Sequence, residues 1–169
     1  MIRQLQGHIS QEQINAITRI IVFQYQAYKQ ITQRDDYQRV FADEYQPHKR
    51  QHSVSWAISS GFRSNTTVVN GFNIECLHYG KGHTRPQLQN ERLIIHILNH
   101  TTHFNADYLK EYYTRNKLEG DSEQLYCYFK FVVDHQQLRR LSLCFPDENG
   151  IVIEEEMLLN NQEIKALVA

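Results

Sequence analysis

The stretch LYCYFKFVV, residues 125–133, decides the fold of this chain. Apolar side chains alternate strictly along it, so one face of an extended strand carries Leu125, Cys127, Phe129, Phe131 and Val133. Residues 138–145 continue the pattern after a short turn, and Asp147-Glu148-Asn149-Gly150 is a second turn sequence. With residues 151–156 as a third strand, we expect an antiparallel meander in the C-terminal part of the chain.

Strand signals also occur upstream of this meander. Asn70-Gly71 favours a tight turn that joins residues 66–69 to an alternating stretch at 72–79, because glycine supplies a positive φ angle. We expect residues 80–89 to be a loop, since Gly80, Gly82 and Pro86 interrupt them. Residues 91–99, ERLIIHILN, fit either a helix or a buried strand, and the short isoleucine-rich run favours the strand.

Helical periodicity dominates the N-terminal third. Ser10 and Gln13 have the spacing of a capping box, and apolar residues then recur every three or four positions to about residue 34. Asp35 or Asp36 can cap a second short helix, whose inner side would carry Tyr37, Val40, Phe41 and Tyr45.

A third helix is expected from Pro47 to Gly61, because proline is tolerated in the first turn and glycine is common just after the last. Further along, Asn105 predicts the start of a helix at 106–116, and residues 162–168 favour a short closing helix.

These elements predict one α+β domain that spans residues 1–169. The N-terminal helices, at about 10–62, would pack on a mainly antiparallel sheet of five or six strands built from about 66–157, with one helix between the two strand groups. A length of 169 residues suits one domain with an ordinary core. A hydrophobic content of 41% and a charged content of 22% argue against a disordered chain and a coiled coil.

Cysteine usage and hydropathy bear on the compartment. Cys76, Cys127 and Cys144 are odd in number and far apart, which favours reduced thiols over a disulfide framework. No apolar run approaches the roughly 18 residues of a membrane span, and the first residues lack the apolar core of a signal peptide. We therefore expect a cytoplasmic protein without a membrane partner.

Charge is distributed unevenly although the formal net charge is only −1. Between His48 and Arg92 six lysines and arginines face two glutamates, which leaves this segment, the basic middle, at +4. From Leu143 to the end, six acidic residues face one lysine. This asymmetry indicates either two surfaces of opposite sign or pairing between the two regions.

The basic middle contains two candidate anion contacts. The glycine-bracketed stretch Gly80-Lys81-Gly82-His83-Thr84-Arg85 lets backbone N–H groups and cations approach a phosphate, although it is not a P-loop. Lys49 and Arg50 would lie in the first turn of a helix beside free backbone donors. The alternative is a solvated connection in both places. The candidate phosphate or polyanion contacts are Lys49, Arg50, Arg63, Lys81, His83, Arg85 and Arg92.

A histidine cluster is the candidate metal site. His96, His100 and His103 would share one face of a helix, where they could bind zinc or manganese. On a strand, His96 and His100 would lie about 13 Å apart, which is too far for one ion. No HExxH or CxxC motif accompanies them, so hydrogen-bonded or exposed histidines are the competing interpretation.

The leading hypothesis is a binding protein of bacterial or mobile-element origin that contacts nucleic acid or another polyanion through the basic middle. No catalytic constellation stands out, which favours a protein that is not an enzyme. One alternative is a metal-dependent hydrolase or nuclease that uses His96, His100 and His103. The other is a protein–protein adaptor or inhibitor whose acidic C-terminal region, around residues 154–156, engages a basic partner.

Overall fold

The computed structural model describes residues 2–35, 37, 47–64, 69–79, 83–99, 124–134, 137–147 and 149–167. Within them, six strands form one mixed sheet in sequence order: β1 (Asn73–Tyr79), β2 (His83–Gln89), β3 (Leu93–Asn99), β4 (Leu125–Asp134), β5 (Gln137–Pro146) and β6 (Val152–Leu159). The described helices are α1 (Gln11–Thr32), α3 (Pro47–Ser64) and α5 (Asn161–Leu167), preceded by a 3₁₀ turn, η1 (Arg3–Leu5). The α+β class is confirmed.

The sheet consists of two antiparallel halves joined by one parallel pair. Strands β1, β2 and β3 pair antiparallel, as do β4, β5 and β6. Between the halves, β3 and β4 run parallel in a register from Leu93 opposite Leu125 to Asn99 opposite Phe131. A parallel pair needs a crossover connection, and residues 100–124 connect these two strands. The helix predicted at 106–116 belongs to this connection and lies outside the described residues.

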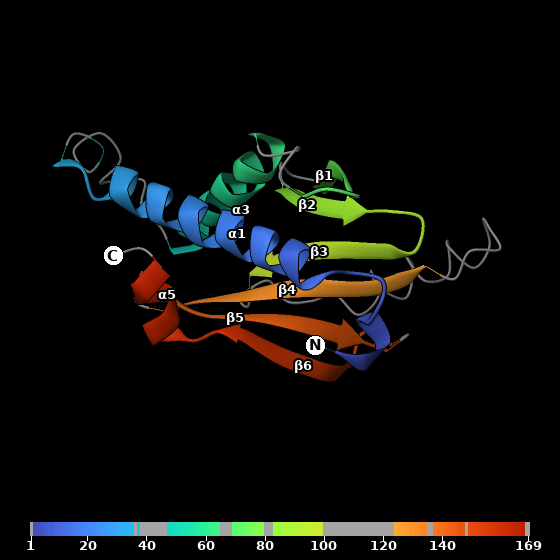
Figure 1. The fold of residues 1–169 in the computed structure, drawn as a ribbon. Helices are drawn as coiled ribbons and strands as arrows, with labels where there is room; N and C mark the ends of the chain where they lie inside the picture. The colour runs from blue at the N-terminus through green and yellow to red at the C-terminus, as the bar shows by residue number, and fades with distance from the viewer. Residues whose placement is uncertain are drawn as a thin grey trace.

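Helices α1, α3 and α5 lie on one face of the sheet (Figure 1). Ser10 and Gln13 form the predicted capping box, because each side chain accepts a hydrogen bond from the other residue's backbone N–H. The buried side of α1 then contributes Ile14, Ile17 and Ile21 to the main core. This core continues into the inner faces of β4 and β5, where it includes Phe129, Phe131, Leu141 and Leu143.

The opposite face of the sheet carries a second, smaller buried cluster of Ile94, Leu98, Tyr126, Tyr128 and Cys144. All seven residues of β3 are therefore buried, on both faces of the sheet. This explains why residues 91–99 show a continuous apolar run and not an alternating pattern.

The loop predicted at residues 80–89 was wrong over residues 83–89, which form β2 and pair with β1. The predicted hairpin partner of β1 at residues 66–69 lies almost wholly outside the described part of the chain, so that pairing stays a prediction. Pro86 misled the prediction because proline cannot donate to a strand ladder. It is tolerated because β2 pairs with β3 only from Gln87 to Gln89, so no bond to β3 is required at Pro86.

Gly61 does not end α3, contrary to the prediction. The helix continues to Ser64, and Gly61 is buried where α3 packs against α1. A Cβ atom at this position would overlap the side chain of Gln24 on α1. The glycine is therefore explained by close packing of two helices and not by a turn. Of the short helix predicted after residue 35, only Asp35 and Tyr37 are described.

Candidate anion-binding site

The predicted phosphate contacts on α3 do not lie together. Lys49 and Arg50 belong to the first turn of this helix, and their side chains lie outside the described part. Arg63 is exposed in the last turn. At 1.5 Å per residue, Lys49 and Arg63 are about 20 Å apart along the helix.

The remaining contacts are spread along β2. Lys81 lies outside the described residues, and His83 and Arg85 are in the first half of the strand, with side chains that are not described. Arg92 lies beyond the other end of the strand, in the turn to β3. A strand of this length spans about 20 Å. The candidate contacts are therefore spread over about 20 Å along each of these two elements, and Arg92 lines a pocket formed by described residues.

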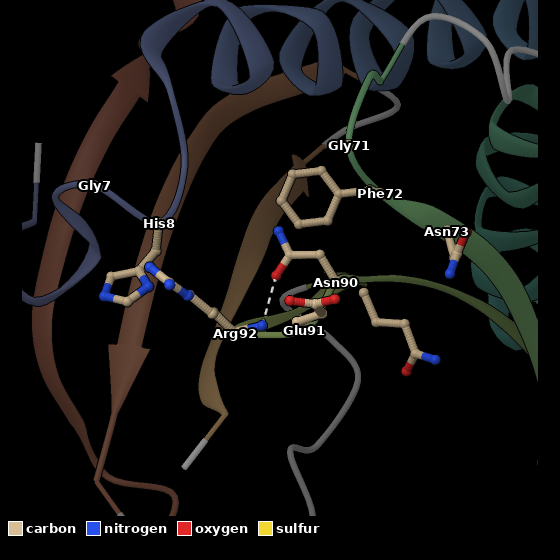
Figure 2. Close-up of a pocket in the computed structure, with 9 residues that line it drawn as sticks. Gly7, His8, Gly71, Phe72, Asn73, Asn90, Glu91 and Arg92 are labelled. Atoms are coloured by element: carbon tan, nitrogen blue, oxygen red, sulfur yellow. Dashed lines mark hydrogen bonds between the residues drawn. The ribbon is translucent and has the colours of Figure 1, made fainter. Parts of the chain in front are cut away.

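That pocket has a volume of about 660 Å³ and lies at the end of the sheet where the β2–β3 turn meets the N-terminal segment (Figure 2). Three segments that are distant in sequence form its walls. They contribute Gly7 and His8 from the N-terminal segment, Gly71, Phe72 and Asn73 from the entry to β1, Gln89 from the end of β2, and Asn90, Glu91 and Arg92 from the β2–β3 turn. The lining combines amide, cationic and acidic side chains, which suits a polar ligand.

Hydrogen bonds fix two of these walls in place. The Asn90 Oδ1 atom accepts bonds from the backbone N–H groups of Arg92, at 2.9 Å, and Leu93, at 2.8 Å. The Gln124 amide donates to the Asn90 carbonyl oxygen at 2.7 Å. On the opposite side, the Gln13 amide on α1 donates to the Asn70 carbonyl oxygen at 2.7 Å. The pocket is therefore formed before any ligand binds.

His8 and Arg92 give the pocket its chemical character. Figure 2 shows the Arg92 side chain extending toward the His8 ring. Among the residues that the structure describes, neither side chain has a hydrogen bond or ion pair, and the His8 Nδ1 atom is buried without a partner. A buried polar atom without a partner costs about 1–3 kcal/mol. An anion in the pocket would pair with the exposed Arg92 side chain, beside the partly buried His8 ring.

Sequence reasoning found Arg92 but missed His8. His8 precedes the basic middle by 40 residues and belongs to no motif, so its position beside Arg92 depends on how the N-terminal segment packs. Ile2, Leu5 and Ile9 anchor that segment in the main core. The steps of three and four between these apolar residues are the signal in the sequence that the segment is held against the domain.

The structure describes one of the three candidate metal ligands. His96 is buried in β3, as the strand interpretation predicted, whereas His100 and His103 lie outside the described residues. The His96 Nε2 atom lies 2.7 Å from the Gln87 Oε1 atom, and its Nδ1 atom lies 3.0 Å from the Tyr126 hydroxyl. In the described ranges, no three histidine, cysteine, aspartate or glutamate side chains form a group that could hold a metal ion. The three-histidine site stays a prediction.

The acidic C-terminal region is partly neutralised within the sheet. Glu155 on β6 pairs with Arg140 at 2.8 Å and with Lys130 at 3.3 Å, on the sheet face opposite the helices. Burial raises the pKa of this carboxyl, but the hydrogen bond from Ser142 and the charges of Lys130 and Arg140 outweigh it, so the net pKa is lowered. These cations come from β4 and β5 and not from the basic middle.

Cys127 and Cys144, the cysteines whose side chains the structure describes, are not suited to catalysis. Cys127 and Cys144 are fully buried and free. Burial raises the pKa of the Cys144 thiol to about 11, and burial together with the neighbouring Cys144 raises the pKa of Cys127 further. Because the thiolate is the nucleophile, both thiols are expected to be unreactive.

None of the helices that the structure describes combines the length and apolarity needed to cross a bilayer. Comparison of the chain with protein-family models, with curated proteins and with solved structures finds no match.

Proposed function

We propose that this protein is a binding protein for anionic ligands, with nucleic acid phosphates as the first candidate and the cytoplasm as its compartment. The proposal is supported by the side chains of Arg92 and His8, which line one pocket and have no hydrogen-bond or ion-pair partner among the described residues. Arginine recognises phosphate through two parallel N–H donors, and an imidazole can donate a third. The remaining cations of the basic middle would extend the contact along α3 and β2 toward neighbouring phosphates of a longer ligand.

Fluorescence anisotropy with labelled single- and double-stranded DNA and RNA tests this proposal across a salt series. Binding should weaken steeply with salt, because neutralised phosphates release counterions. Arg92→Ala should weaken binding about tenfold and make the salt slope shallower by about one ion. Arg19→Ala is the matched control, since Arg19 is an exposed arginine on α1 outside both the pocket and the basic middle. Its binding should equal that of the wild type.

Two results would overturn the proposal. One is the absence of binding to every nucleic acid at low salt, together with no binding of inorganic pyrophosphate as a minimal polyanion. The other is an equal effect of Arg92→Ala and Arg19→Ala, which would indicate diffuse charge attraction without a site at Arg92.

The edge strand β6 supports a second candidate, a protein partner. Ile151 precedes this strand and Val152, Ile153 and Met157 belong to it, and all four are exposed. Exposed apolar side chains on an edge strand favour addition of an extended peptide. The neighbouring glutamates favour a peptide with lysine or arginine at alternate positions. Binding of an alternating valine–lysine peptide, lost on Glu154→Lys, would support this candidate over the first.

A further inference from the structure

The only tryptophan of the chain lies on the surface of α3. Trp56 is 64% exposed, although aromatic side chains gain more than most from burial. The buried side of this helix is formed instead by Val54, Ile58 and Phe62, which are at most 5% exposed. At about 100° per residue, Trp56 lies on the side of the helix that faces away from these three residues. Packing in the described core therefore does not account for Trp56.

Two cationic residues share the side of α3 on which Trp56 lies. Lys49 precedes Trp56 by seven positions and Arg63 follows it by seven, which is close to two helical turns in each direction. The backbone of α3 therefore places the three residues in one row along the helix, which we call the Trp56 row. Neighbours in this row are about 10 Å apart along the helix axis. Arg63, like Trp56, is exposed.

The composition of α3 indicates what kind of ligand this row suits. Residues 47–64 include Lys49, Arg50 and Arg63 and contain no aspartate or glutamate. Among the described side chains of the helix, Trp56 is the one large apolar group that is exposed. A protein partner favours a broader apolar patch, whereas cations around a single aromatic ring favour a ligand that combines negative charge with flat rings. Nucleic acid has both.

An unpaired strand fits the row better than a duplex does. In a duplex the bases stack on one another, and exposing the face of a base to Trp56 would cost unstacking energy. A single strand presents its bases without this cost. It can also extend along the helix to both Lys49 and Arg63, which a small anion cannot do because the two residues are about 20 Å apart.

We infer that the Trp56 row binds single-stranded nucleic acid, with the Trp56 ring stacked on an unpaired base and with Lys49 and Arg63 on phosphates to either side of it. This inference rests on the proposed nucleic acid function and narrows its ligand to unpaired strands. The phosphate contacts fix the position of the strand, and the stacked base provides the preference for single strands over duplexes.

The fluorescence of Trp56 reports stacking directly, because the chain has no other tryptophan. Stacking of a base on the indole ring quenches its emission, so oligothymidylate should quench the fluorescence of the wild type. A blunt duplex of the same length should bind more weakly and quench less. Inorganic pyrophosphate, which has no ring, should leave the emission unchanged. Equal affinity for strand and duplex, or equal quenching by pyrophosphate, would overturn the inference.

Substitutions measured by anisotropy with labelled oligothymidylate separate stacking from charge. Trp56→Ala should lower the affinity about tenfold and keep the salt slope, because it removes an aromatic ring and no charge. Trp56→Phe should restore most of this affinity, since a phenyl ring also stacks on a base. Arg63→Ala should instead make the salt slope shallower by about one ion.

Phe23→Ala is the matched control. Phe23 is a 52% exposed aromatic side chain on α1, and the residues seven positions before and after it, Ala16 and Gln30, carry no charge. Its affinity for oligothymidylate should equal that of the wild type, and a loss as large as that of Trp56→Ala would overturn the inference by indicating general apolar attraction.

Other outcomes distinguish this inference from the proposal on which it rests. Unchanged affinity in Trp56→Ala would overturn the inference and leave the nucleic acid proposal at Arg92 intact. Absence of binding to every nucleic acid at low salt would overturn both. Self-association of the wild type that Trp56→Ala abolishes, without binding of oligothymidylate, would overturn the inference by assigning the row to a second copy of this chain.

Discussion

Gly61 of α3 lies directly against the side chain of Gln24 on α1, where a Cβ atom on residue 61 would overlap the Gln24 Cγ atom. Alanine normally stabilises a helix interior by about 1 kcal/mol relative to glycine. Overpacking at a tight helix contact costs about 1–3 kcal/mol, so Gly61→Ala should destabilise the protein by about 1 kcal/mol in urea unfolding. With Gln24→Ala present, the same substitution should instead stabilise it. Equal effects in both backgrounds would contradict this packing role for Gly61.

Removing the Tyr126 hydroxyl should destabilise the protein by about 1–3 kcal/mol. Tyr126→Phe would leave the buried His96 Nδ1 atom without the donor that lies 3.0 Å away. The ring itself and its packing against Ile94 and Leu98 in the second cluster would be kept. Urea unfolding of the variant measures the loss, and a free energy of unfolding equal to that of the wild type would show that the hydroxyl is dispensable.

The ion cluster on β4, β5 and β6 predicts a loss of stability in acid. The folded state lowers the pKa of Glu155, so its contribution is present above the ordinary range of glutamate and is lost as the pH falls through the folded value. Glu155→Gln should lower the free energy of unfolding by about 1 kcal/mol at neutral pH and by less at low pH. Lys165→Gln, in an exposed position on α5, serves as a charge control. If the free energy of unfolding differed between wild type and Glu155→Gln by the same amount at every pH, the prediction would be contradicted.

The buried Cys144 thiol and Tyr25 hydroxyl predict a loss of stability at alkaline pH. Burial raises the pKa of Cys144 from 9.0 to about 11, and burial raises that of Tyr25 from 10.0 to about 12 despite the charge of Arg139. The unfolded chain loses these protons first, so stability is complete below pH 9 and falls as the pH rises toward these values. The Cys144 thiol alone should account for on the order of 2–3 kcal/mol between pH 9 and pH 11. Cys144→Ala should make the free energy of unfolding depend less on pH over this interval. An unchanged pH dependence would show that the Cys144 thiol does not cause the loss.

The alternating stretch at 125–133 predicted β4 correctly because its pattern depends only on neighbouring residues along one strand. The helices α1 and α3 were predicted for the same reason, since the cap at Ser10 and the proline at 47 act locally. Strand β2 was missed because Pro86 is tolerated only where β3 no longer pairs with β2. That condition depends on how far β2 pairs with β3, which the local sequence does not determine.

Long-range contacts account for what the sequence did not reveal about the site. Arg92 was a candidate through its charge, but His8 joins it only because the N-terminal segment is anchored in the core. His96 was recognised as unusual, whereas its partners Gln87 and Tyr126 come from two neighbouring strands whose register a single sequence does not determine.

The parallel register of β3 and β4 has a consequence for the order of folding. Within each half of the described sheet, neighbouring strands are joined by short turns, so their pairing has low contact order and is expected to be fast. Leu93 and Leu125, by contrast, are 32 positions apart, and closing a connection of this length costs about 2 kcal/mol more entropy than closing a three-residue turn. Docking of the two halves along β3 and β4 is therefore the expected late step. Substitutions that weaken this pairing should slow refolding more than equally destabilising substitutions within β6.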